Sequence, residues 1–256
     1  MSAARGRLTW QLLVMAFFSS NLCCQLFAAE PRSGYEFQSA DTQTLQDDDF
    51  QNPGMLWVDQ GEALFSAANG ESGKACADCH NDMRGVARSF PQRNPETQQL
   101  MSLTQQIQHC RTEHQGAAPL AYEGNSALAL SAYIGNQSRG LPFAPVPAGL
   151  APELARGKAY YYRRKGQLNL GCQHCHEDSV GKMLRGDKIS QGHSTGYPIY
   201  RLEWQSAGSL HRRFRSCDIG VRAQPFAIGS QTYTEVELFL RQRAGALPLE
   251  VPAVRH

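Results

Sequence analysis

The pentapeptides CADCH, at residues 76–80, and CQHCH, at residues 172–176, decide what kind of protein this chain of 256 residues is. In the pattern Cys-x-x-Cys-His, the two thiols add to the vinyl groups of a haem and the histidine coordinates its iron. A zinc knuckle or a redox dithiol needs the cysteine pair, but neither needs a histidine directly after it, and neither needs the pattern twice. The residues of the two motifs are Cys76, Cys79 and His80, and Cys172, Cys175 and His176. The sequence therefore predicts two covalently bound haem c groups, each with a histidine on its iron.

The first 29 residues have the layout of a secretory signal peptide. Arg5 and Arg7 precede an apolar run at residues 12–18, and the small residues Ala28 and Ala29 follow. The run is too short to span a membrane, so we expect export to the periplasm and no membrane partner. Because this segment carries two basic residues and no acidic one, its removal brings the formal net charge from +2 to zero. A near-neutral mature chain implies no nucleic-acid partner.

The chain also contains an internal repeat. A glycine lies fifteen residues before the first cysteine of each haem motif, at Gly61 and Gly157, and an aromatic residue follows each glycine by four positions. Landmarks that recur about 96 residues apart predict two homologous domains. We place these two haem-binding domains at residues 30–150 and 151–256, with a proline-rich linker at 142–152.

The pattern within each domain is helical. We expect helices over residues 126–134 and 232–243, the second started by a capping box at Thr232 and Glu235 and stopped by Gly245. No alternation typical of strands reaches a comparable length. The sequence therefore predicts an all-α fold of two tandem cytochrome c-like haem domains related by internal duplication.

Two cysteines outside the haem motifs, Cys110 and Cys217, occupy corresponding positions in the repeats. An electron-carrying cytochrome c commonly has a methionine as its second iron ligand, but no methionine is placed equivalently in both repeats. We therefore predict that Cys110 and Cys217 complete the coordination of the first and second iron. A disulfide between them, which an exported protein permits, is the alternative. The rival ligands are His109 for the first haem and His193 or His211 for the second.

The two cysteines differ in the charge that precedes them. Residues 210–216, just before Cys217, contain three arginines, and Arg222 follows, whereas residues 105–109 before Cys110 contain none. Guanidinium groups near a thiol favour the thiolate and attract a small dianion. A solvated basic surface is the alternative interpretation. The segment around Cys217 is therefore a candidate site for anion chemistry.

Three stretches of the chain resemble a known family. They are RFRSCDIGVRAQPF at residues 213–226, LPLEVPAVR at residues 247–255 and QDDDFQNPG at residues 46–54. They are similar to SoxA, the dihaem subunit of the SoxAX cytochrome in thiosulfate oxidation. Some members of this family lack the first haem motif, but this chain retains it, so the resemblance implies the two-haem form.

The resemblance implies an activity and partners. SoxAX is an L-cysteine S-thiosulfotransferase: it joins thiosulfate to a cysteine of the carrier protein SoxYZ and passes two electrons to a small cytochrome c. The active cysteine of the family corresponds to Cys217, which binds the second haem iron and can exist as a persulfide. The arginine four residues before it corresponds to Arg213, which is expected to bind thiosulfate. SoxX, a small monohaem cytochrome c, is the expected partner subunit.

Two other functions fit the same motifs. One is a dihaem thiosulfate dehydrogenase, which couples two thiosulfates into tetrathionate and needs no acceptor protein. The other is a non-catalytic dihaem electron carrier, in which Cys217 is only an iron ligand. The segment around Cys217 and Arg213 favours SoxA over both.

Overall fold

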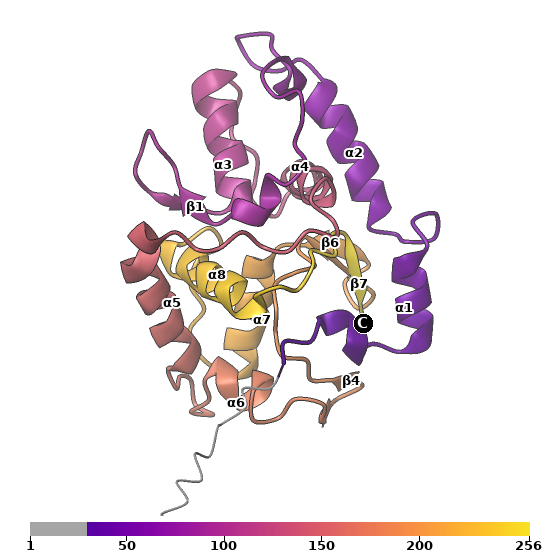
Figure 1. Cartoon of the computed structure of the whole chain (residues 1–256), viewed down its shortest axis with the longest axis vertical. Helices are drawn as coiled ribbons and strands as arrows, with labels where there is room; N and C mark the ends of the chain where they lie inside the picture. Colours follow the sequence, from indigo (N-terminus) through magenta and orange to yellow (C-terminus); the bar gives the residue numbers. More distant parts are fainter. Residues whose placement is uncertain (1–29) are drawn as a thin grey trace, which may run out of the picture. The chain divides into compact units, whose positions relative to one another are not determined.

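Two pairs of crossing helices form the framework of the chain. The computed structural model describes residues 30–256, so the expected signal peptide lies outside the described residues. Helix α2 (Met55–Ser66) packs against α4 (Asn125–Asn136), and α5 (Ala151–Tyr162) packs against α8 (Gln231–Ala244) (Figure 1). The two helices expected from the sequence are therefore present as α4 and α8, each slightly longer than expected.

A glycine lets each helix pair approach closely. A Cβ atom at Gly61 would lie 2.1 Å from the carbonyl oxygen of Ala129, and one at Gly157 would lie 2.0 Å from that of Glu235. Both distances are far below van der Waals contact, so only glycine permits these crossings. The glycines found in the repeat thus have the same packing role in both halves of the chain.

Shorter helices complete the framework, and serines cap several of them. They are α1 (Ala40–Asp47), α3 (Leu103–His109), α6 (Cys172–His176), α7 (Leu210–Gly220), four 3-10 turns (Gly34–Phe37, Cys76–Asp78, Ala87–Ser89 and Ala148–Leu150) and one π-helical turn (Cys110–His114). The capping box expected at Thr232 is wrong: the side chain of Ser230 accepts from the backbone of Tyr233 and starts α8 two residues earlier. Gly245 ends α8 with a φ of 57°, as expected.

Three small sheets accompany the helices. Strands β1 (Gln92–Arg93) and β2 (Leu100–Met101) form one hairpin, β3 (Met183–Leu184) and β4 (Asp187–Lys188) form another, and β5 (Ile199–Arg201) lies between antiparallel β6 (Ser206–Gly208) and parallel β7 (Ala253–Arg255). The framework is helical as expected, but a strictly all-α description does not hold. Strands of two or three residues are too short to leave an alternating pattern in the sequence.

Each half of the chain has its own hydrophobic core. In the first, Phe65 and Leu130 are buried and Cys76 packs against them; in the second, Tyr161 and Tyr233 are buried and Cys172 packs against their cluster. The first cysteine of each haem motif therefore lies against a core. Residues 31–256 nevertheless form one compact unit.

Arg241 joins the two halves. Arg241 is 2% exposed, and its guanidinium donates to the carbonyl oxygens of Ser89 and Pro91 and of Ala144 and Pro145. Burial lowers its pKa to about 10. Four carbonyls from two separate segments thus satisfy one buried cation, which fixes the proline-rich linker against α8.

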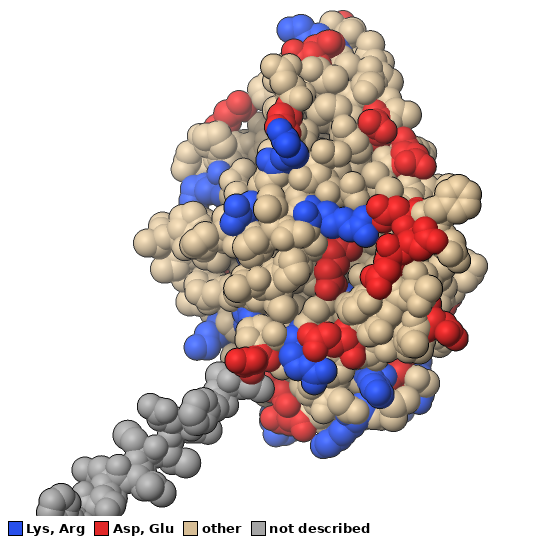
Figure 2. All heavy atoms as spheres, turned by 45° about the vertical axis from the view of Figure 1, so that its right-hand side comes forward, with Lys and Arg blue, Asp and Glu red and all other residues tan. Residues whose placement is uncertain are grey.

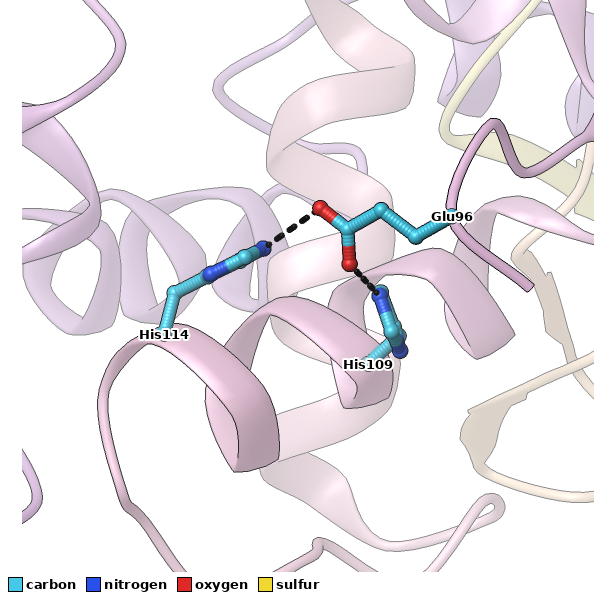
Figure 3. Close-up of side chains that lie close together, drawn as sticks. All are labelled: Glu96, His109 and His114. Atoms are coloured by element: carbon cyan, nitrogen blue, oxygen red, sulfur yellow. Dashed lines mark hydrogen bonds and ion pairs between the residues drawn. The ribbon is translucent and has the colours of Figure 1, made fainter.

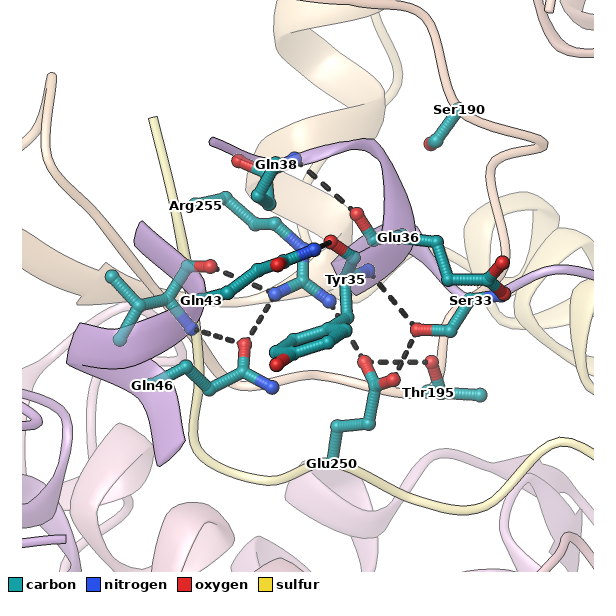
Figure 4. Close-up of polar contacts among 12 residues, drawn as sticks. Ser33, Tyr35, Glu36, Gln38, Gln43, Gln46, Ser190, Thr195, Glu250 and Arg255 are labelled. Carbon is teal, nitrogen blue, oxygen red and sulfur yellow. Dashed lines mark hydrogen bonds and ion pairs between the residues drawn. The ribbon is translucent and has the colours of Figure 1, made fainter. Parts of the chain in front are cut away.

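A second polar network ties the two ends of the described chain together (Figure 4). Arg255 pairs with Glu250 at 2.7 Å and donates to the side-chain oxygen of Gln46. Glu250 also accepts hydrogen bonds from the hydroxyl groups of Ser33 and Thr195. Because these groups are largely buried, each depends on its partner for the hydrogen bonds that water would otherwise supply.

We expect Arg255→Met to lower the free energy of unfolding by about 3 kcal/mol, because it leaves the carboxylate of Glu250 largely buried without a cation. Urea unfolding followed by circular dichroism measures this. The matched control is Arg84→Ala, which breaks the exposed pair with Asp82 at 3.0 Å and is expected to change nothing measurable. Equal stability of the two variants would contradict the prediction.

Charges of both signs are interspersed over the face of the molecule shown in Figure 2. That face has no extended basic area of the kind that binds nucleic acid. Within residues 30–256, no helix combines the length and the apolar character needed to cross a membrane.

Candidate active site

Helix α7 positions Cys217 and Arg213 on one face. Ser209 starts the helix by accepting from the backbone of Arg212, and Arg213 precedes Cys217 by four residues. In an α-helix, side chains four residues apart are neighbours. The side chain of His176, the last residue of α6 and of the second haem motif, hydrogen-bonds to the thiol of Cys217. Three residues predicted from the sequence therefore meet at this point.

The surroundings of Cys217 favour its thiolate. Burial on its own raises the pKa of the thiol, but the positive charge of Arg213 and the hydrogen bond with His176 outweigh burial and lower the pKa to about 7. The effect is mutual, since the charge of Cys217 raises the pKa of Arg213. A thiol with this pKa is substantially ionised at neutral pH, which makes it a nucleophile and a metal ligand.

The other arginines of the segment point elsewhere. Arg212 stacks on the ring of Trp204 at 4.1 Å, Arg215 donates to a backbone carbonyl at 2.8 Å, and Arg222 donates to a glutamine side chain at 3.4 Å. The expectation of several guanidinium groups around the thiol is therefore wrong, and only Arg213 takes that position. These arginines lie close together in the sequence, but successive residues of a helix face different directions.

Two residues that the sequence did not single out support the site. Burial raises the pKa of Tyr197, and the charges of Arg213 and Cys217 both act on it, so its ring lies beside them. Asp218 is 1% exposed and accepts from the hydroxyl groups of Tyr160 and Tyr233, each at 2.7 Å, besides its ion pair with a lysine. Asp218 follows Cys217 directly, so it anchors the turn of α7 that carries the thiol.

The surroundings of His176 fit a haem ligand. Its Nδ1 lies 2.8 Å from the carbonyl oxygen of Ser190, so Nε2 is the ring nitrogen that faces Cys217 and that would bind a metal. Gly192 lies flat against the imidazole: a Cβ there would be 2.7 Å from its Cγ. Burial raises the pKa of the Cys172 thiol to about 11, and the charge of Cys217 acts on both Cys172 and Cys175. The residues predicted for the second haem therefore lie together.

Fewer of the residues predicted for the first haem lie close together. Burial raises the pKa of Cys76, and the charge of Cys110 adds to that effect, so these two thiols are neighbours. The side-chain amide of Gln106 donates to the sulfur of Cys110 at 3.3 Å. Cys79 and His80 are exposed at the end of the motif. The structure thus brings together Cys76 and Cys110, and the side chain of His80 is exposed.

The six cysteines within residues 30–256 are all free, so Cys110 and Cys217 form no disulfide. The rival histidines have other roles. His109 lies 2.9 Å from a carboxylate oxygen of Glu96, and His211 is fully buried and stacked on Tyr122 at 5.2 Å. His193 is held neutral, since burial above all lowers its pKa to about 4.

The first cysteine of each haem motif packs against a core. In the second motif, the histidine has one ring nitrogen hydrogen-bonded and the other facing the thiol of Cys217. This arrangement defines a c-type cytochrome with an additional sulfur site. Residues 60–143 match the family model of the SoxA/TsdA cytochrome c domain, which implies covalently bound haem c. The chain is 38% identical to the L-cysteine S-thiosulfotransferase subunit SoxA of Pseudaminobacter salicylatoxidans over 232 residues, covering 88% of this chain and 81% of that protein. The corresponding subunit of Rhodovulum sulfidophilum is also 38% identical, over 89% and 81% of the two chains.

Among solved structures, the crystal structure of SoxXA from P. pantotrophus matches with a TM-score of 0.85 and 35% identity, over 88% of this chain and 87% of that one. The chain belongs to the SoxA family. The resemblance stated from the three stretches of sequence is therefore confirmed, as is a cytochrome c fold.

Proposed function

We propose that this chain acts as the SoxA subunit of an L-cysteine S-thiosulfotransferase that joins thiosulfate to a cysteine of the carrier SoxYZ. Its relatives are named for this activity. The observation that carries the proposal is the placement of the Cys217 thiol between Arg213, one turn earlier on α7, and His176, which together favour its thiolate. A partner subunit SoxX is inferred because the matching solved structure is a SoxXA complex.

Arg213 and Cys217 divide the work of the reaction. Thiosulfate carries two negative charges, and the planar guanidinium of Arg213 offers paired hydrogen bonds that neutralise and orient it. Cys217 supplies the nucleophilic sulfur: removal of two electrons joins its thiolate to the outer sulfur of thiosulfate, and the carrier thiol then displaces Cys217, which regains a proton. In the net reaction the carrier thiol loses its proton, a bond forms between its sulfur and the outer sulfur of thiosulfate, and two electrons leave for a small cytochrome c.

Two haem c groups are proposed, one for each motif. Their thioether bonds are assigned to Cys76 and Cys79 and to Cys172 and Cys175, and their iron ligands to His80 with Cys110 and to His176 with Cys217. When bound, a haem supplies an acceptor for electrons close to the reacting sulfur. The hydrogen bond from His176 to Ser190 and that from Gln106 to Cys110 would hold one ligand of each pair in place.

Internal duplication is part of the proposal, with the haem domains at residues 30–150 and 151–256. The equivalent crossings at Gly61 and Gly157 support it. So do two isolated antiparallel bridges just before the haem motifs, which pair Asn69 with Lys74, and Lys165 with Leu170.

Export is the remaining part of the proposal. The basic residues and the apolar run within residues 1–29 are the basis for a signal peptide and a periplasmic location. SoxYZ, the small cytochrome c and thiosulfate would all meet the chain in that compartment.

The protein purified with SoxX and mixed with thiosulfate tests the proposal. We expect reduction of added cytochrome c only when SoxYZ is present, together with a gain in the carrier's mass equal to one thiosulfate. A carrier whose acceptor cysteine is replaced by serine is the control, and it should give neither signal. Tetrathionate formed without any carrier would instead identify a thiosulfate dehydrogenase. Electron transfer to cytochrome c at a rate that does not depend on thiosulfate would identify a non-catalytic electron carrier.

A further inference from the structure

Three side chains outside the haem motifs converge near the start of the π-helical turn (Figure 3). The Nε2 atom of His109 lies 2.9 Å from one carboxylate oxygen of Glu96, and the Nε2 atom of His114 lies 3.5 Å from the other. Each imidazole therefore faces its own oxygen of a single carboxylate. The ligand atoms of all three side chains lie within 4.8 Å of one another.

The π-helical turn is what brings the two histidines together. Residues five apart in an α-helix point about 140° away from each other, because the α-helix has 3.6 residues per turn. In the turn Cys110–His114 the hydrogen bonds instead join residues five apart, so His114 lies roughly above His109. Their rings meet edge to face with centroids 5.8 Å apart.

The carboxylate is held on the opposite side by the hairpin of β1 and β2. The side-chain oxygen of Asn94 accepts from the backbone N–H of Glu96 at 2.8 Å, which fixes the start of the hairpin loop. The amide of Asn94, itself 2% exposed, donates to Gln106 of α3 at 3.0 Å. The loop that carries Glu96 is thus fastened to the helix that carries His109, so the cluster is assembled before any ligand arrives.

We propose that Glu96, His109 and His114 form a binding site for a divalent transition-metal cation of the zinc class. Two imidazole nitrogens and one carboxylate oxygen are a donor set that Zn²⁺ binds, with a fourth position left for water. His109 is 12% exposed, but Glu96 and His114 are 55% and 53% exposed, so a hydrated cation can enter from solvent. A bound cation would clamp the hairpin loop to the turn that begins at Cys110.

Calorimetric titration of the tag-free holoprotein with Zn²⁺, after treatment with a chelator, tests the site. We expect one Zn²⁺ to bind, and His114→Ala to weaken its binding at least about tenfold, since even residues that only orient metal ligands cost this much. Glu96→Gln keeps the shape of the carboxylate without its charge and should weaken binding similarly. Both variants leave the buried His109 in place, and an unchanged haem absorption spectrum checks that they fold.

His256→Ala is the matched control. His256 is an exposed histidine that pairs with Asp187 at 3.1 Å, and within residues 30–256 no third potential metal ligand joins this pair. We expect its loss to leave Zn²⁺ binding unchanged. Zinc should also raise the unfolding temperature of the wild type but not of His114→Ala, because a ligand stabilises only the state that binds it. Absence of binding in the wild type, or equal binding in wild type and His114→Ala, would overturn the proposal.

Discussion

Cys217→Ser is expected to lower kcat/KM for transfer of thiosulfate to SoxYZ by at least about 10⁴-fold. Serine has nearly the shape of cysteine, but its hydroxyl cannot carry a sulfane sulfur, and at neutral pH it stays protonated where the thiol of Cys217, with a pKa of about 7, ionises. Covalent haem content should not change, because the attachment cysteines are untouched. Stopped-flow reduction of cytochrome c in the presence of SoxYZ measures the rate, and the mass of the holoprotein checks the haems.

The internal repeat offers a matched control for this variant. Cys110→Ser removes the corresponding thiol of the first half. The residue four positions before Cys110 is a glutamine, not an arginine. We expect it to change kcat/KM within about tenfold. Similar losses for the two variants would show that both thiols serve only as ligands, and the proposed transferase chemistry at Cys217 would then fail.

The grouping of the second haem motif's residues could be predicted because it depends on local spacing. The five-residue motif fixes the relative positions of Cys172, Cys175 and His176 whatever the fold. The glycine repeat could be predicted for a similar reason, since Gly61 and Gly157 each mark a place where two helices touch. Signals of this kind survive in a single sequence because each residue type has few alternatives at its position.

Two residues that support the site, Tyr197 and Ser190, could not be predicted, because they come from distant segments. Tyr197 reaches the site from the loop before β5, and Ser190 holds His176 through a backbone carbonyl that any residue could offer. The arginines near Cys217 show the opposite error. Four arginines in one stretch predicted that several guanidinium groups would surround the thiol. The helix instead directs Arg212 onto Trp204 and only Arg213 toward the thiol.

The short strands were missed for an energetic reason. The parallel pair β5 and β7 joins residue 199 to residue 253, and neither strand exceeds three residues. Their stability comes from side chains such as Arg255, which donates to Gln46 in a segment far away in the sequence, and not from a pattern within the strand.

Arg213→Ala is expected to reduce kcat/KM for thiosulfate on the order of 10³-fold, comparable to the loss of one oriented donor to a developing charge in other enzymes. Arg213→Lys should retain part of the activity, because an ammonium keeps the charge but not the paired hydrogen bonds. The matched control is the neighbouring Arg212→Ala, whose side chain stacks on Trp204 at 4.1 Å and should not affect turnover. Steady-state kinetics with SoxYZ as acceptor distinguishes the three variants.

The pH dependence of kcat/KM distinguishes an effect of Arg213 on the Cys217 thiol from a purely structural role of Arg213. The charge of Arg213 is the largest influence that lowers the pKa of Cys217, so its removal should raise that pKa above about 7 and shift the alkaline rise of activity to higher pH. The variant should therefore recover part of its activity as the pH increases, while Arg212→Ala follows the wild-type profile. A uniform loss at every pH would mean that Arg213 acts on thiosulfate alone. Unchanged turnover in both Arg213→Ala and Arg212→Ala would show that Arg213 takes no part in the reaction.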